Sequence, residues 1–293
     1  MNMKEIQAKI LVDAKCTLAE GPFYDETCNG LYWTDITPGN LHFYDLETGE
    51  HNYVHIGRNL GSFALTDKGR IIAGLDDGIY ILQGPRCIPY CKPAAALRDD
   101  CRYNDGKCDP FGRFVVGTAC TPNNAQQGTL VSVSGKDKSM DLCGGIGCSN
   151  GLAWSLDNKT MYYVDTLVET PSTITAFDYD GATGVASNRR EIINYAEKAA
   201  KGWLADGMTI DCNGNLWIAE WRGYGVACYD PRTGEQLAHI SVPAKFVSCC
   251  TFGGKDYSKL FITTAASDDE FGGGVFVAEP GVTGFAPVRF KED

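Results

Sequence analysis

The sequence has no long hydrophobic run and no excess of positive charge. None of its apolar stretches approaches the ~18 residues that a membrane-spanning helix needs. Acidic residues outnumber basic residues by 37 to 26, which gives a formal net charge of −11. Because nucleic-acid backbones require surfaces rich in Lys and Arg, we expect neither a nucleic-acid partner nor a membrane partner. An acidic surplus keeps a protein soluble and is also compatible with a cation site.

Paired Cys-x-x-Cys motifs and an apolar N-terminal signal region are also absent. The chain has 13 cysteines, but their spacing does not resemble that of a structural zinc site. Without a signal region we expect a cytoplasmic protein, in which the cysteines are free thiols. Cys101 and Cys108 have no nearby histidine to make a reactive thiolate, and the adjacent Cys249 and Cys250 are expected to face opposite sides of one strand.

Helical patterns are scarce, because only residues 194–202 have a helical composition. An α/β fold would need many such segments, so that class is excluded. The chain instead repeats a unit in which an acid or amide beside a glycine precedes a short apolar strand, a polar turn and a second strand. The units are predicted to begin at Glu20, Ser62, Asn104, Asn150, Asp206 and Ser248.

The spacing of these units indicates the fold. Consecutive units begin 42 to 56 residues apart, and propeller blades repeat every ~40–50 residues. The longest spacing contains the one helical segment. We therefore predict an all-β, six-bladed β-propeller that forms a single domain over residues 1–293. A β-sandwich or two smaller β domains would not require so even a period.

Each unit contains further strands of β-branched and aromatic residues between turn residues. Second strands are predicted at residues 30–35, 69–74, 112–117, 160–165, 215–220 and 259–264. Third strands are predicted at residues 41–45, 174–178 and 226–230.

The starts of the units carry the candidate site. Inner strands of a propeller surround a central channel, and the loops that lead into them ring one mouth of it. Glu20, Asn104, Asn150 and Asp206 begin inner strands of separate blades, so we predict that they converge. Two carboxylates and an amide oxygen suit Ca²⁺, Mg²⁺ or Mn²⁺. The alternative is that these residues only form turns, since Asn-Gly and Asp-Gly are common turn dipeptides.

Arg102 stands beside this set. A guanidinium there can clamp polyol oxygens or stabilise developing negative charge, and the alternative is an exposed loop cation. A different site is suggested by residues 147–151, Gly-Cys-Ser-Asn-Gly, which match the nucleophile elbow of serine hydrolases. An elbow requires a strand-to-helix turn, whereas the segment that follows has the pattern of a strand. Only His239 follows the serine, so we disfavour this interpretation.

Two further histidines are excluded as a joint metal site. His51 and His55 are four residues apart, which on a strand separates them by ~13 Å. We expect both on the surface.

Several blocks of the sequence resemble the senescence-marker-protein/gluconolactonase family, which includes regucalcin, sugar lactonases and luciferin-regenerating enzyme. The resemblance extends from Glu20 to Pro287. The blocks that carry it are Arg102–Pro110, Ser149–Asp157, Tyr162–Asp165, Ala176–Asp180, Ser187–Arg190, Asp206–Asp211 and Cys250–Gly254.

This resemblance implies a six-bladed propeller that hydrolyses lactones with one divalent metal, with Ca²⁺ expected first and Zn²⁺, Mn²⁺ or Mg²⁺ as alternatives. Glu20, Asn150 and Asp206 match the metal ligands of the family, and Arg102 and Asn104 match its substrate-contacting positions. Asp206 also matches the proposed general base. Because metal binding lowers the basicity of a ligand, another carboxylate or a metal-bound hydroxide is the alternative base.

The resemblance also has a departure. Animal gluconolactonases have a longer acidic loop where this chain has the shorter, uncharged residues 120–127, so no substrate-gripping glutamate carries over. The identity of the lactone is therefore left open, as are phosphotriester hydrolysis at the same metal and the oligomeric state. The alternative function is that of a calcium-binding regulatory protein without turnover, which would have no use for Arg102.

Overall fold

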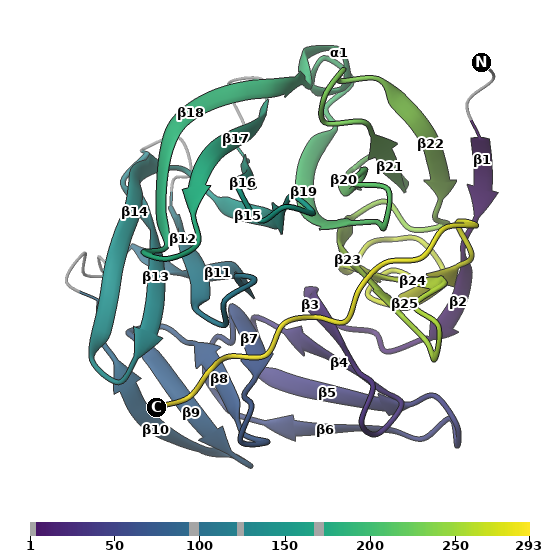
Figure 1. Ribbon diagram of the computed structural model, residues 1–293. Coiled ribbons are helices and arrows are strands. Elements are labelled where there is room, and N and C mark those ends of the chain that lie inside the picture. Colours follow the sequence, from purple (N-terminus) through teal and green to yellow (C-terminus); the bar gives the residue numbers. More distant parts are fainter. Residues whose placement is uncertain (1–3, 94–99, 122–125, 167–172) are drawn as a thin grey trace.

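A computed structural model describes residues 4–93, 100–121, 126–166 and 173–293, and it forms a ring of six β-sheets around a central channel (Figure 1). Each sheet is one blade and runs from an inner strand at the channel to an outer strand at the rim. The predicted all-β, six-bladed β-propeller is confirmed.

Blades 1 to 6 follow the order of the chain, and each predicted unit start lies on an inner strand. Blades 1 to 3 contain β3 (Ala19–Asp25), β4 (Gly30–Asp35), β5 (Asn40–Asp45), β6 (His51–His55); β7 (Ser62–Leu65), β8 (Ile71–Gly74), β9 (Ile79–Gln83), β10 (Arg86–Cys91); and β11 (Cys101–Cys108), β12 (Phe114–Cys120), β13 (Gly128–Gly135), β14 (Lys138–Ile146). Blades 4 to 6 contain β15 (Ser149–Trp154), β16 (Thr160–Asp165), β17 (Thr173–Asp180), β18 (Val185–Asn194); β19 (Leu204–Ile210), β20 (Leu216–Trp221), β21 (Gly225–Tyr229), β22 (Gln236–Ser241); and β23 (Val247–Gly253), β24 (Lys259–Thr264), β25 (Val275–Ala278).

Two N-terminal strands close the ring. β2 (Lys9–Val12) pairs antiparallel with β25 and supplies the outer strand of blade 6. β1 (Lys4–Gln7) pairs parallel with β22 and extends blade 5. The first and last parts of the chain therefore share a sheet. β22 and β25 would otherwise be edge strands, and β1 and β2 pair with them (Figure 1).

Burial decreases from the channel to the rim. Every residue of the inner strands β15 and β23 is buried, whereas the outer strands β6 and β18 are mostly exposed. Aromatic side chains fill the space between neighbouring blades, as where Trp217 of blade 5 packs edge-on against Phe252 of blade 6 at 6.2 Å. The blades therefore form a continuous core, which holds the starts of the inner strands in fixed positions.

The segment with a helical composition contains α1 (Ala196–Ala199), a helix of four residues and the only α-helix in the described part of the chain. It is shorter than the predicted span of 194–202. Among the described residues, no helix is long and apolar enough to cross a membrane.

The cysteine prediction was wrong for one pair. Cys101 and Cys120 form a disulfide between β11 and β12, while the other eleven cysteines are free as expected. The two residues are direct partners in the antiparallel register, so their Cα atoms lie 4.0 Å apart. The pairing follows from strand register, which the sequence spacing does not reveal. Cys249 and Cys250 both lie on β23, as predicted.

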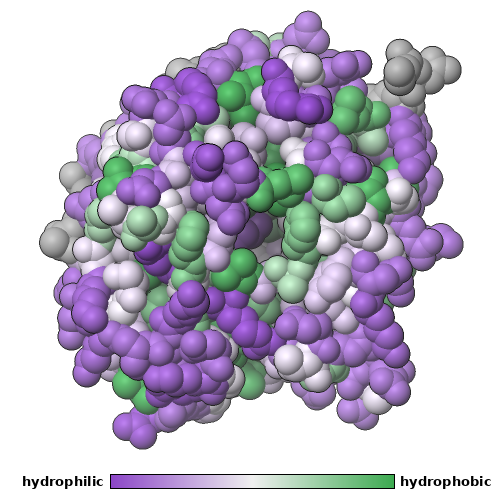
Figure 2. Space-filling model, in the orientation of Figure 1, coloured by the Kyte–Doolittle hydropathy of each residue, from purple (hydrophilic) through white to green (hydrophobic). Residues whose placement is uncertain are grey.

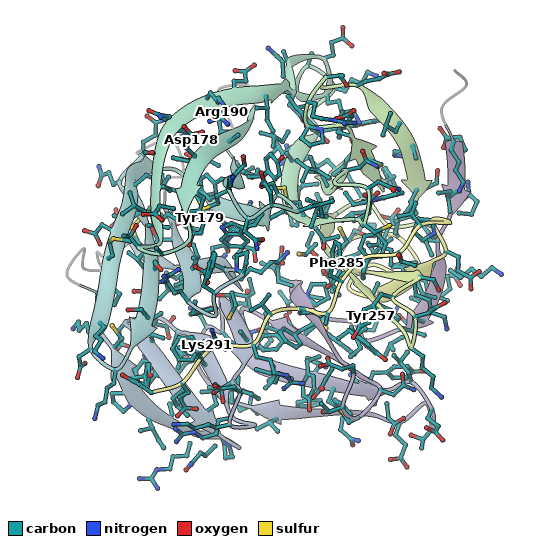
Figure 3. The ribbon with its side chains drawn as sticks, viewed as in Figure 1. Asp178, Tyr179, Arg190, Tyr257, Phe285 and Lys291 are labelled. Atoms are coloured by element: carbon teal, nitrogen blue, oxygen red, sulfur yellow. A yellow bond between two sulfur atoms is a disulfide. The ribbon has the colours of Figure 1, made fainter. Side chains whose placement is uncertain are left out.

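The turn after β11 contains the buried carboxylate of Asp109. Its Oδ2 accepts hydrogen bonds from Arg113 Nη1 at 2.8 Å and from the hydroxyl of Tyr179 at 2.5 Å. Tyr179 belongs to β17 of the next blade, where Figure 3 labels it, so this carboxylate ties blade 3 to blade 4.

Replacing Asp109 with alanine is expected to lower the free energy of unfolding by about 1–3 kcal/mol, because the buried hydroxyl of Tyr179 and the half-buried guanidinium of Arg113 lose the acceptor that they share. Asp157 lies in the matching turn of blade 4 but is exposed, and it accepts hydrogen bonds from Ser155 and Lys159. Asp157→Ala is therefore the matched control and should leave stability almost unchanged. Urea unfolding of both variants measures the difference, and equal losses would contradict this role of Asp109.

Candidate functional site

The predicted site residues lie at irregularities of the inner strands. The pairing register shifts between Glu20 and Phe23 of β3 and between Tyr103 and Gly106 of β11. Equivalent shifts occur in two further inner strands, between Ser149 and Leu152 of β15 and between Ala205 and Met208 of β19. A bulge re-aims the side chains that it contains. The recurring acid/amide–glycine pattern therefore marks a bulge at one end of the channel in four blades.

Glycines next to these residues allow neighbouring inner strands to approach each other. A Cβ atom on Gly151 would lie 2.7 Å from the carbonyl oxygen of Asp206 and 2.9 Å from the amide nitrogen of Met208. A Cβ atom on Gly207 would lie 2.3 Å from the sulfur of Cys249. Neither glycine adopts a positive φ. The alternative that these dipeptides only form turns is therefore wrong for Asn150-Gly151 and Asp206-Gly207, which lie within strands.

Three buried carboxylates lie near enough to one another to interact electrostatically. Glu20, Asp105 and Asp206 are all at least nine-tenths buried. Burial raises the pKa of Asp206 well above its ordinary value, and the charges of Glu20 and Asp105 raise it further. Burial and the charge of Asp105 likewise raise the pKa of Glu20. The three groups therefore repel one another and together favour a cation.

A network of amides and one arginine borders the carboxylates. Nδ2 of Asn104 donates to Oδ1 of Asn150 at 2.9 Å, and Nδ2 of Asn150 donates to Thr166 at 2.8 Å. Arg102 Nη1 donates to Oδ1 of Asn104 at 2.6 Å. The charge of Arg102 acts on both Glu20 and Asp206, whose pKa values it lowers against the larger effect of burial. Arg102 is thus held beside the carboxylates and half-buried, which excludes a free loop cation.

The donor set fits a divalent cation. Carboxylate and amide oxygens of Glu20, Asn150, Asp206 and Asp105 are hard ligands of the kind that Ca²⁺, Mg²⁺ and Mn²⁺ prefer. Two side-chain cations lie near these donors. Arg102 acts on Glu20 and Asp206, and Lys107 acts on Asp105 while its ammonium donates to the carbonyl of Met208 at 2.6 Å. A bound cation would reverse the mutual repulsion of the buried carboxylates.

The structure brings together all five predicted residues, Glu20, Arg102, Asn104, Asn150 and Asp206, through the contacts and charges described above.

Sequence reasoning missed Asp105 and Cys249. Donor atoms of Glu20, Asp105 and Cys249 lie within 4.8 Å of one another. Asp105 directly precedes Gly106, as Glu20, Asn150 and Asp206 precede their glycines. Aligning the units on the glycine would have found it.

The serine-hydrolase interpretation is not supported by the structure. Ser149 begins the strand β15 and is fully buried, so no strand-to-helix elbow exists at this position. His239 lies on β22, where its ring nitrogens face Glu5 at 3.4 Å and Glu220 at 3.3 Å. His51 and His55 both lie on the strand β6. His55 is exposed as predicted, whereas His51 is half-buried and packs against Trp33.

The C-terminal segment lies across part of the opposite mouth of the channel. This segment, residues 279–293, crosses the front of the ring in Figure 1, and Figure 3 labels Phe285 on it. A cavity of about 300 Å³ opens there between Phe285 and Trp154. Hydrophobic side chains gather around a central hollow on this face (Figure 2). The predicted residues lie at the starts of the inner strands, so this apolar cavity is separate from the candidate site.

Comparison with known proteins identifies the family. The sequence profile of the SMP-30/gluconolactonase/LRE-like region matches residues 18–266. The chain belongs to this family. Regucalcin of Xenopus laevis is 32% identical, with 98% of this chain and 99% of regucalcin covered. Pentonolactonase XacC of Haloferax volcanii is 32% identical over 89% of this chain and 86% of its own length.

A solved structure of luciferin-regenerating enzyme, another protein similar to this chain, superimposes with a TM-score of 0.84 at 28% identity and covers 98% of this chain and 99% of that one. The resemblance inferred from the sequence blocks is thus confirmed at the level of the family. The prediction for the loop at residues 120–127 concerns in part residues 122–125, which lie outside the described residues.

Proposed function

We propose that this protein is a divalent-metal-dependent lactonase that hydrolyses a sugar lactone to the free hydroxy acid. The single observation that carries the proposal is the convergence of buried oxygen donors from separate blades beside one arginine. The match to a family described as gluconolactonase, and to a pentonolactonase, supports the substrate class. Glu20, Asn150 and Asp206 are the proposed metal ligands, and Ca²⁺ is the ion expected first.

When bound, the ion acts as a Lewis acid that polarises the carbonyl of the lactone. The protein supplies the remaining chemistry. Asp206 accepts a proton from water as the water oxygen bonds to the carbonyl carbon. The bond between that carbon and the ring oxygen then breaks, and the proton passes to the departing ring oxygen. Burial and the charges of Glu20 and Asp105 raise the pKa of Asp206, which opposes the loss of basicity that a bound cation would cause.

Arg102 and Asn104 are the proposed substrate contacts. The guanidinium already donates to the amide oxygen of Asn104, so the two side chains form one rigid unit. Its remaining N–H groups can donate to the hydroxyls or the developing negative charge of the substrate.

The proposed function is tested by pH-stat measurement of acid release from a panel of aldonolactones. The purified protein is assayed as prepared, after chelation, and after addition of Ca²⁺, Mg²⁺, Mn²⁺ or Zn²⁺. We expect turnover that stops on chelation and returns with one or more of the ions. Tight Ca²⁺ binding without turnover of any lactone would favour the calcium-binding alternative, and turnover that survives complete chelation would exclude metal dependence.

Gly151→Ala is expected to reduce kcat/KM by about 100-fold, because the new methyl group would displace the backbone of Asp206, and displacements near 1 Å can cost this much. Gly144 is a matched control, since a Cβ atom there would meet nothing within 4 Å. Gly144→Ala should retain activity. Activity of the Gly151 variant equal to that of the control would show that close approach of the two strands is not required.

A further inference from the structure

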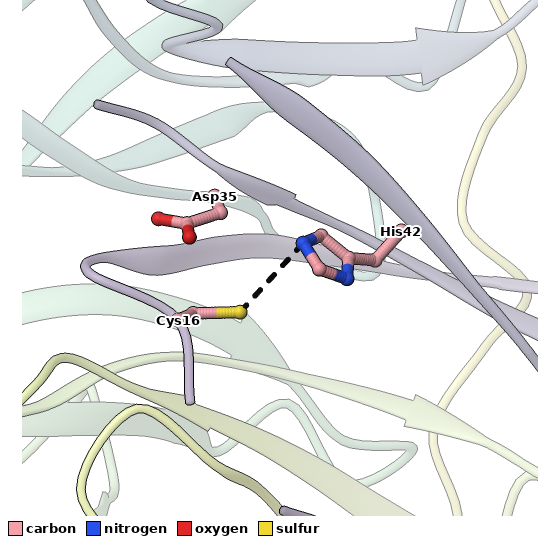
Figure 4. Close-up of side chains that lie close together, drawn as sticks. All are labelled: Cys16, Asp35 and His42. Atoms are coloured by element: carbon pink, nitrogen blue, oxygen red, sulfur yellow. Dashed lines mark hydrogen bonds between the residues drawn. The ribbon is translucent and has the colours of Figure 1, made fainter. Parts of the chain in front are cut away.

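A second group of metal-ligating side chains lies in blade 1, apart from the candidate site. Cys16 belongs to the segment that links β2 to β3, Asp35 ends β4, and His42 lies on β5. One donor atom from each lies within 4.8 Å of the others, and all three residues are buried (Figure 4). The function proposed above uses none of them.

The spacing of the donor atoms suits zinc. The sulfur of Cys16 lies 3.8 Å from Nε2 of His42. Zinc binds sulfur at ~2.3 Å and imidazole nitrogen at ~2.0–2.1 Å, so a tetrahedral site separates the two donors by ~3.5 Å. Small side-chain movements would therefore be enough to admit the ion. Thiolate and imidazole ligands favour zinc over Ca²⁺ or Mg²⁺.

Neighbouring groups already orient two of the donors. Nδ1 of His42 lies 2.9 Å from Nε2 of His51 and forms a hydrogen bond with it, which leaves Nε2 of His42 to face the sulfur. The carboxylate of Asp35 accepts hydrogen bonds from the backbone N–H groups of Thr17 and Leu18 at 3.0 and 2.8 Å. Zinc sites use such outer hydrogen bonds to fix the direction of their ligands.

Trp33 supplies an independent observation. It is completely buried, and its Nε1–H has no hydrogen-bond acceptor among the described residues. A buried donor without an acceptor costs about 1–3 kcal/mol. The sulfur of Cys16 is a neighbour of this group. A metal-bound thiolate would provide the acceptor that the indole lacks.

We propose that Cys16, Asp35 and His42 bind one zinc ion, with a water molecule or the second oxygen of Asp35 in the fourth position. The ion replaces the thiol proton of Cys16, which leaves to solvent. Its role is structural, since Cys16 is 1% exposed and no substrate can reach it. Because the linker leads from the closing strand β2 to blade 1, the ion fastens the closure of the propeller to its first blade.

The proposal is tested by titration of the metal-free full-length protein with Co²⁺, a spectroscopic substitute for zinc, in the presence of a reductant without thiols. We expect a thiolate-to-cobalt charge-transfer band in the near ultraviolet that saturates at one ion per chain and is removed by added Zn²⁺. Cys16→Ser should abolish the band. Cys249→Ser and Asp206→Ala, which alter only the channel site, should retain it. Because these two controls alter the channel site, a failure of the proposed lactonase can be distinguished from a failure of the proposed zinc site.

The absence of the band in the wild type, its survival in Cys16→Ser, or its loss in Cys249→Ser would each overturn the proposal. If Cys16→Ser does not fold, X-ray absorption of the zinc-loaded wild type decides. The proposal requires one sulfur and at least one imidazole around zinc, whereas the described channel site contains no histidine. A shell of oxygen ligands alone would refute it.

Discussion

Asp206→Ala is expected to lower lactone hydrolysis by about 1000-fold or more and to abolish divalent-cation binding in the channel. Two losses combine in this variant, because Asp206 is both a proposed ligand and the proposed proton acceptor. Metal polarisation of a carbonyl is worth several kcal/mol, and each 1.36 kcal/mol changes the rate about tenfold. The side chain is buried at the start of β19.

Calorimetric titration with Ca²⁺ and steady-state kinetics measure the two losses separately. Asp256→Ala, which removes an exposed carboxylate from a turn of blade 6, is the control and should match the wild type. Normal Ca²⁺ affinity in Asp206→Ala would remove Asp206 from the ligand set. Loss of turnover with normal Ca²⁺ affinity would leave it only the role of base.

Arg102→Ala is expected to reduce kcat/KM by about 100-fold while the affinity for Ca²⁺ stays within a few fold of the wild type. A hydrogen bond from a charged group contributes about 1.5–3 kcal/mol, and the guanidinium can make more than one to the substrate. The positively charged guanidinium of Arg102 does not bind the metal ion, so the oxygen donors of Glu20, Asn150 and Asp206 remain in Arg102→Ala.

The control for Arg102 is Arg86→Ala, which removes an exposed arginine from the outer strand β10. Kinetics with a lactone and titration with Ca²⁺ are measured on both variants. If Arg102→Ala retained wild-type kinetics, the residue would have no role with the substrate. If Arg102→Ala lost Ca²⁺ binding, the effect would instead come through Asn104, to which the Arg102 side chain donates at 2.6 Å.

Repetition explains why the fold was predictable. The six predicted second strands overlap β4, β8, β12, β16, β20 and β24, because turns of Asp, Asn and Gly bound each run. The starts of the units are also correct, since one bulge recurs at one place in several inner strands. Equivalent positions in the repeats therefore predicted that distant residues converge, even Glu20 and Asp206, which are 186 residues apart.

Features that depend on contacts between strands were not predictable in this way. Cys101 and Cys120 pair because they are register partners, and nothing in their spacing of 19 residues indicates it. Asp105 was missed because the unit was aligned on Asn104 rather than on Gly106. The cluster of Cys16, Asp35 and His42 combines a linker and two strands, whose contact the sequence spacing does not reveal.

The central claim is that oxygen donors of separate blades bind one divalent ion in the channel. Its most direct test is anomalous diffraction from crystals of the full-length protein grown with Mn²⁺, which identifies the ion by its own scattering. The account predicts one channel peak within bonding distance of the oxygens of Glu20, Asn150 and Asp206. The absence of an anomalous peak in the channel of crystals saturated with Mn²⁺ would contradict the account. A channel peak that Asp206 does not contact would contradict it as well.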